Sequence, residues 1–84
     1  MPRFFFHLVN DTSSVMDEEG QELASREAAC AIARRTIGEV IAQDVAAGRN
    51  AVHLAIMIDD EAGDRVFDVK AVATVVVAED PLIA

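Results

Sequence analysis

Residues 25–48 read SREAACAIARRTIGEVIAQDVAAG, and residues 51–59 follow them as AVHLAIMID. The first stretch is rich in alanine, contains no proline, and repeats its larger apolar side chains at helical spacing, which predicts one amphipathic helix over about residues 25–47. Ser25 is a good N-cap, and Gly48 stands where a helix C-terminus favours glycine. The second stretch places Val, Leu or Ile at every second position, which predicts a strand with one strongly apolar face.

Three further segments of the chain have the composition of strands. Residues 3–9 are rich in phenylalanine and branched side chains, and residues 15–16 form a very short candidate. Residues 66–70 return antiparallel to the preceding strand through a glycine-containing turn. Residues 72–78 are rich in valine and either extend that last strand or add another.

The predicted order of the elements is β-β-α-β-β. Because a single helix covers only one face of a sheet, the fold class is α+β, a two-layer sandwich with the long helix (about 25–47) packed on one face of a mostly antiparallel sheet. The pairing of residues 3–9 with the later hairpin is an assumption. We expect one α+β domain over residues 1–78 and a frayed C-terminal tail over residues 79–84.

The composition excludes several classes of protein. Seven basic and fifteen acidic residues give a formal net charge of −8, while 52% of the residues are hydrophobic, a fraction too high for a disordered chain. Cys30 is the only cysteine, so no internal disulfide can form. The apolar run Phe4–Val9 is shorter than a signal-peptide core, and no apolar stretch approaches the ~20 residues that cross a bilayer. We therefore expect a cytoplasmic protein that does not bind a membrane.

Direct binding to nucleic acid is not expected. Proteins that bind phosphates cluster their basic residues, whereas here these are scattered and Arg34-Arg35 is the only adjacent pair. The chain contains neither Trp nor Tyr to stack on bases. The acidic charge instead leaves open a basic protein partner.

The opening residues, Met-Pro-Arg-Phe-Phe-Phe-His, resemble the start of a small bacterial family of uncharacterised α+β domains, whose members begin with Met-Pro-Arg, then Phe or Tyr, then Phe-Phe-His. Members of that family also carry a D-E-E-G turn, a Glu-Leu pair before an alanine- and arginine-rich helix, and a D-E-A-G hairpin. These motifs are matched by residues 17–20, 22–23 and 60–63. The resemblance covers roughly residues 1–70 and departs at the valine-rich residues 71–84. It implies a stand-alone domain of unknown function and brings no catalytic residues with it.

Two histidines are the candidates for site chemistry. His7 and His53 have the same parity in their predicted strands, so their imidazoles can approach each other if those strands are neighbours, and Asp59 shares the parity of His53. Such a group is a candidate metal site or a group that titrates near neutral pH. The structural alternative is that His7 is hydrogen-bonded to the adjacent turn and His53 is exposed. The two acidic turns lack the ligand spacing of a calcium loop, and we assign no metal and no cofactor.

No catalytic constellation accompanies these residues. Cys30 flanks the apolar side of the predicted helix, where thiols are usually inert, and neither histidine is near it in sequence. The isolated glycines make no phosphate-binding loop. We therefore expect a protein that is not an enzyme, and a metal-binding enzyme or sensor based on His7 and His53 is the remaining alternative.

The second face of the sheet and the C-terminal segment carry further apolar side chains. With the helix on one face, these interface candidates are left without cover: Phe5, Val9, Ala55, Met57, Val66, Val72, Val75 and Val77. Exposed contiguous apolar surface on a small protein usually marks an interface, and a symmetric homodimer is the simplest way to cover it. The sequence therefore predicts a non-catalytic interaction module that self-associates through its open sheet face or its C-terminal strand. The alternative is an acidic regulator, antitoxin-like or mimicking nucleic acid, that binds a basic partner protein.

Overall fold

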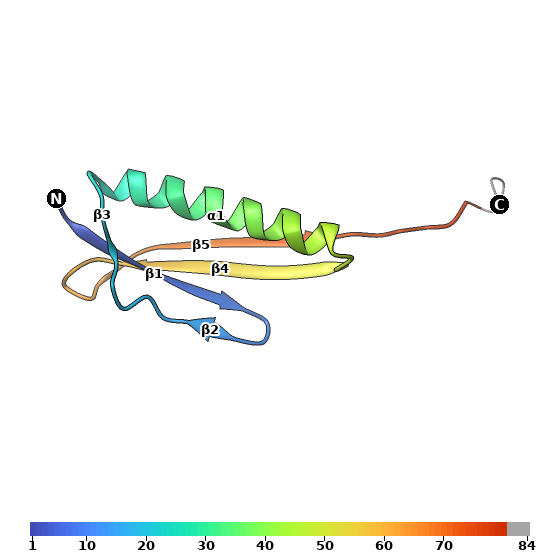
Figure 1. Cartoon of the computed structure of the whole chain (residues 1–84), viewed down its shortest axis with the longest axis horizontal. Coiled ribbons are helices and arrows are strands. Elements are labelled where there is room, and N and C mark those ends of the chain that lie inside the picture. Colours follow the sequence, from blue (N-terminus) through green and yellow to red (C-terminus); the bar gives the residue numbers. More distant parts are fainter. Residues whose placement is uncertain (81–84) are drawn as a thin grey trace.

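One helix lies along one face of a five-stranded sheet in the computed structural model of the chain, which describes residues 1–80 (Figure 1). The elements follow in the order β1 (Arg3–Asn10), β2 (Ser14–Val15), β3 (Gln21–Glu22), α1 (Arg26–Ala46), β4 (Ala51–Asp59) and β5 (Arg65–Thr74). This is the predicted α+β arrangement of two layers. The additional strand β3 is not predicted from the sequence, because a two-residue bridge is too short to show alternation.

The four main strands lie in the spatial order β2-β1-β4-β5, and each neighbouring pair is antiparallel. At the centre of the sheet β1 pairs with β4, and Phe6 lies opposite Ile58. The assumed pairing of the N-terminal strand with the later hairpin is therefore confirmed. β3 adds a short antiparallel bridge at the start of β1, where Arg3 lies opposite Glu22.

The boundaries of α1 agree with the sequence prediction. The hydroxyl of Ser25 accepts a hydrogen bond from the amide of Ala28 at 3.1 Å, which satisfies one of the free donors at the start of the helix. The helix ends at Ala46, and Gly48 follows with a φ of +99°, which glycine adopts without strain. Within residues 1–80, no helix has both the length and the apolar character that crossing a membrane requires.

The core lies between α1 and the sheet. Three elements supply its buried cluster: Phe4, Ala29, Ala33, Ile37, Leu54, Ile56 and Ile58. Partly buried side chains of β1 and β5 pack against it, namely Phe6, Leu8, Phe67, Val69 and Ala71. The apolar face predicted for residues 51–59 therefore lies against the helix. Two of the three buried helix residues are alanines, and their small side chains allow α1 to approach the sheet closely.

The strand β5 resolves the alternative left open for the C-terminal segment. It runs from Arg65 to Thr74, so residues 72–74 extend the predicted strand, whereas residues 75–78 follow it without belonging to a strand. The amide of Val75 still donates to the carbonyl of Asn50 at 2.7 Å, and the following residues continue in the direction of β5, away from the helix and sheet (Figure 1). The expected frayed tail, residues 79–84, lies largely outside the described residues.

A β-bulge at the start of β5 changes one predicted orientation. Ile58 lies opposite Phe67, but the next residue, Asp59, lies opposite Arg65. Val66 is the inserted residue, and it packs against the cluster beneath the helix. Its assignment to the open face is therefore wrong, because strict alternation along a strand makes no allowance for an extra residue.

Candidate functional site

A network of hydrogen-bonded polar side chains crosses the sheet at one end. His7 on β1 lies between Asp17, in the loop that joins β2 to β3, and Asp59, at the end of β4. The amide of Asp17 donates to Nδ1 of His7 at 3.1 Å, and Nε2 of His7 lies 3.1 Å from Oδ2 of Asp59. On β5, Arg65 donates to Oδ1 of Asp59 at 2.5 Å and to Asp68 at 2.9 Å. This polar network therefore connects the three neighbouring strands β1, β4 and β5.

The contacts of His7 determine its tautomer. A backbone amide can only donate, so Nδ1 of His7 accepts, and Nε2 carries the proton that is donated to Asp59. The side chain is also buried, since only 8% of the residue is exposed. Both ring nitrogens are thus used within the fold, and neither has a lone pair free for a metal ion. His7 therefore has the structural role of the second alternative, but its donor is Asp17 in the loop after β2 rather than the turn that directly follows β1.

His53 does not join this group. The residue opposite His7 on β4 is Met57, four positions from His53, and four residues of strand span about 13 Å. His53 is exposed and lies opposite Val72. Of the three candidates for a site, the structure therefore brings together His7 and Asp59 and leaves His53 apart. Within residues 1–80, no group of three or more His, Cys, Asp or Glu side chains is arranged to hold a metal ion.

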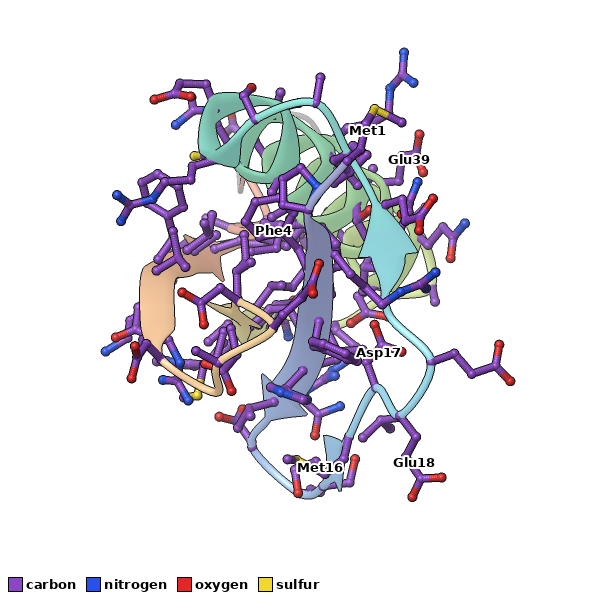
Figure 2. The ribbon with its side chains drawn as sticks, turned by 90° about the vertical axis from the view of Figure 1, so that its left-hand side faces the viewer. Met1, Phe4, Met16, Asp17, Glu18 and Glu39 are labelled. Carbon is purple, nitrogen blue, oxygen red and sulfur yellow. The ribbon has the colours of Figure 1, made fainter. Side chains whose placement is uncertain are left out.

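Asp17 organises the loop between β2 and β3. Its carboxylate accepts hydrogen bonds from the amides of Phe6 at 3.0 Å, Glu19 at 3.2 Å and Gly20 at 3.0 Å. Burial raises the pKa of Asp17, but these hydrogen bonds and the nearby imidazole outweigh it and hold the pKa below its ordinary value of 3.8. Figure 2 shows Asp17 on the β1 side of this loop and Glu18 on its outer side.

Asp59 is held in its charged form mainly by Arg65. The hydrogen bond from Arg65 lowers the pKa of Asp59 most, burial opposes this, and the charge of Arg65 and the contact with His7 lower the pKa further. The hydrogen bonds to Asp59 and Asp68 in turn raise the pKa of Arg65. Asp59 is therefore charged at neutral pH and paired with Arg65, and its other oxygen accepts the Nε2 proton of His7.

The two acidic turns meet at Arg3, although they are about forty residues apart in sequence. The guanidinium of Arg3 donates to the carbonyl of Glu19 at 2.9 Å and lies 3.4 Å from the carboxylate of Glu22. The backbone amide of Arg3 donates to the carboxylate of Glu61 at 2.6 Å. The N-terminal motif and both turns that carry the family resemblance thus form one structural junction.

Gly20 allows this junction to close. It has a φ of +72°, and a Cβ atom there would lie 2.9 Å from each of three atoms: Cγ of Arg3, the carbonyl oxygen of Phe4 and Cε1 of Phe5. A distance of that kind to a backbone oxygen is not tolerated, so no larger residue fits without moving the loop. Both the close packing and the positive φ at this position of the D-E-E-G turn therefore require glycine.

The predicted interface residues lie in different surroundings. Phe5 and Met57 are half-buried, at the end of the sheet where the polar network lies. Val9, Ala55 and Val72 line a shallow hollow of about 200 Å³ at the other end. The hollow is bounded by polar residues as well, namely Asn10, Asp11, His53 and Lys70. The open face is therefore apolar only in part.

Three strongly exposed valines lie on β5 and in the segment after it. Val72 is 65% exposed, and Val76 and Val77 are each 85% exposed. Within residues 1–80, β5 pairs with β4 on one side and has no strand along its other side. The predicted interface residues Val75 and Val77 lie in the extended segment that follows this edge strand.

Sequence reasoning missed Asp17, a partner of His7, and Arg65, a partner of Asp59. Asp17 is the first residue of the D-E-E-G motif, which predicts a turn but gives no sign that the turn folds back onto β1. Arg65 escapes notice because the β-bulge shifts the register of β5 and places it opposite Asp59. The motif itself is the signal that could have drawn attention to Asp17.

A family model described as a domain of unknown function, DUF6894, matches residues 3–73. The matched range holds all six elements except the last residue of β5, and the segment with Val76 and Val77 lies beyond it. No curated protein and no solved structure matches the chain.

Proposed function

The chain belongs to this DUF6894 family of domains of unknown function, and we propose that it is a non-catalytic interaction module that binds a second copy of itself along the outer edge of β5. The observation that carries the proposal is a ten-residue strand with one side unpaired within residues 1–80, continued by exposed valines. Such an edge presents a row of free amide and carbonyl groups, and another strand is the partner that satisfies all of them.

The distribution of charge favours the edge of β5 over the open face as the main contact. On that face β5 carries Asp68, Lys70 and Thr74, and Val72 is its only large apolar side chain. Packing two such faces together would bury charged groups, which is costly unless each finds a partner. Pairing of the edges satisfies the backbone while the ends of Asp68 and Lys70 stay at the surface.

A role without catalysis agrees with how the polar cluster is used. His7, Asp17, Asp59 and Arg65 bond to one another or to the backbone, as polar groups that stabilise a fold do. The cluster joins strands and a loop, and it does not present a free base beside a cavity.

The test is the molar mass of the protein in solution, measured by size-exclusion chromatography with light scattering over a concentration series. We expect a dimer that dissociates on dilution. Val72→Glu should shift the equilibrium to monomer, because it places a carboxylate on the contact edge. The matched control is Val15→Glu, since Val15 is 61% exposed on β2, at the opposite edge of the sheet. A monomer at every concentration contradicts the proposal.

A second candidate, an acidic regulator of a basic protein, is supported by the junction at Arg3. There the structure brings together two acidic turns, with Glu19 and Glu22 from one and Glu61 from the other. Opposite charges would steer a basic partner to this end, and the association would weaken with salt. Capture of a basic protein that is lost at high salt and in a Glu22→Gln/Glu61→Gln variant supports this candidate, and capture that is insensitive to salt contradicts it.

A further inference from the structure

We infer that the two copies exchange their C-terminal segments: residues 75–80 of each copy pair antiparallel with β5 of the other, and the two-fold axis passes beside Val75. This inference rests on the proposed self-association and adds the segment, the register and the charges that fix it. The partner is thus a second copy of this chain rather than an unrelated protein.

The hydrogen bond between Val75 and Asn50 shows which backbone groups of β5 are free. Because the amide of Val75 donates to Asn50, the residue faces β4, and alternation turns the amides and carbonyls of Lys70, Val72 and Thr74 to the outer edge. By the same alternation, the amide and carbonyl of Val76 also point to the outer edge. The free donors and acceptors therefore continue from β5 into the segment after it.

The segment after β5 is shaped for such a contact. It continues in the direction of the strand, away from the helix and sheet of its own copy (Figure 1). Val76 and Val77 are each 85% exposed, so they bury little on their own copy. With the axis at Val75, Val76 lies opposite Thr74 of the second copy and Val77 opposite Ala73, which gives both valines a neighbouring strand.

Charge complementarity selects this register. The axis at Val75 places Lys70 opposite Asp80 of the second copy, twice in the dimer. Lys70 makes no ion pair within residues 1–80, so each new pair gives it a first partner. An axis one residue earlier, at Thr74, would instead set Asp68 opposite Asp80, and like charges directly opposite are unfavourable. Still earlier axes bring the acidic end of the segment toward the acidic turn before β5.

A second cation lies beside the same position on the helix side of the sheet. Arg34 of α1 lines a groove of about 280 Å³ together with Val69, Lys70 and Ala71 of β5. In the inferred register Glu79 of the second copy lies opposite Ala71, whose side chain faces the helix. Glu79 therefore reaches the groove near Arg34, which likewise makes no ion pair within the described residues. The acidic end of the segment thus meets cations on both faces of β5.

A disulfide at the axis tests the register directly. Two residues Val75 related by the axis form a non-hydrogen-bonded antiparallel pair, whose Cα atoms lie about 4.5 Å apart, within the range of a disulfide. In a Cys30→Ser background, Val75→Cys should give a covalent dimer under mild oxidation. Lys70→Cys in the same background is the control, because its symmetry mate would lie far along the edge, and it should cross-link much less.

Charge reversal tests the contact without a new covalent bond. Lys70→Glu should weaken the dimer by about tenfold, because it creates two repulsive pairs where two attractive ones stood. The double variant Lys70→Glu/Asp80→Lys should recover most of the loss. Arg35→Glu is the matched control for net charge, since Arg35 is exposed on the helix and does not line the groove. Circular dichroism should show all of these variants to be folded.

The outcomes separate the two proposals. A dimer that is cross-linked by Val75→Cys and rescued by the charge exchange supports the inferred register. A dimer that cross-links equally at Lys70→Cys, or is indifferent to Lys70→Glu, overturns the register and leaves self-association standing. A protein that is monomeric throughout overturns both.

Discussion

The backbone amide of Asp17 donates a hydrogen bond to Nδ1 of His7, at 3.1 Å. This bond joins the loop after β2 to the middle of β1, and it leaves Nε2 of His7 to donate to Asp59. A residue that looks like a candidate metal ligand in the sequence therefore acts as a connector between a loop and two strands.

Replacing His7 should destabilise the fold. His7→Ala removes both hydrogen bonds of a buried side chain and leaves the amide of Asp17 without its acceptor, which costs about 1–3 kcal/mol in the free energy of unfolding. His53→Ala is the matched control, and since His53 is exposed its cost should stay within about 0.5 kcal/mol. Urea denaturation measures both. Equal losses in the two variants would show that His7 does not connect the elements as described.

Acid should destabilise the protein in part through Asp17 and Asp59. The pKa of each carboxyl in the native state lies below its ordinary value of 3.8, so the unfolded state takes up these protons first as the pH falls. The contribution of these groups to the free energy of unfolding is therefore complete above about pH 4 and is lost as the pH falls through the lower native pKa values.

Urea denaturation between neutral pH and pH 2 measures this dependence. Asp17→Asn and Asp59→Asn should each be less stable at neutral pH and lose less further stability in acid, whereas Glu18→Gln should keep the pH dependence of the unchanged protein. If both Asp variants kept the pH dependence of the unchanged protein, Asp17 and Asp59 would not be among the groups that make the fold sensitive to acid.

Two glycines should respond to alanine in opposite directions. Gly20→Ala forces a positive φ on alanine and a Cβ atom 2.9 Å from the carbonyl oxygen of Phe4, so it should cost more than about 1 kcal/mol. Gly38→Ala lies within α1 with nothing within 4 Å of the new atom, so it should stabilise the protein by about 0.5–1 kcal/mol. Thermal unfolding of the two variants measures the difference. A stabilising Gly20→Ala would mean that the loop does not pass close to β1.

The helix, the central strands and their inward faces could be predicted because each rests on a local pattern. Ser25 and Gly48 mark the two ends of α1, and the alternation in residues 51–59 assigns the buried face of β4. These signals lie within a few residues of the feature that they predict, so a single sequence shows them.

The site depends on contacts that no local pattern encodes. His7 meets Asp17 because a loop turns back, and it meets Asp59 because β1 pairs with β4 in one particular register. A shift of one residue in that register would separate His7 from Asp59. Val66 shows the same limit, since one inserted residue reverses the face that alternation predicts.

The alanines on the inner side of α1 should be intolerant of larger side chains. Ala33 has none of its surface exposed and lies in the cluster with Ile37 and Ile56, so Ala33→Leu inserts a side chain where the interior is already filled. We expect a loss of about 1–3 kcal/mol in the free energy of unfolding, because helix and sheet must move apart or adopt strained rotamers. Ala31→Leu is the matched control on the exposed side of α1, and its effect should be within about 0.5 kcal/mol. Urea denaturation of the pair decides the point: if both variants are equally stable, the helix does not lie as close to the sheet as the buried alanines indicate.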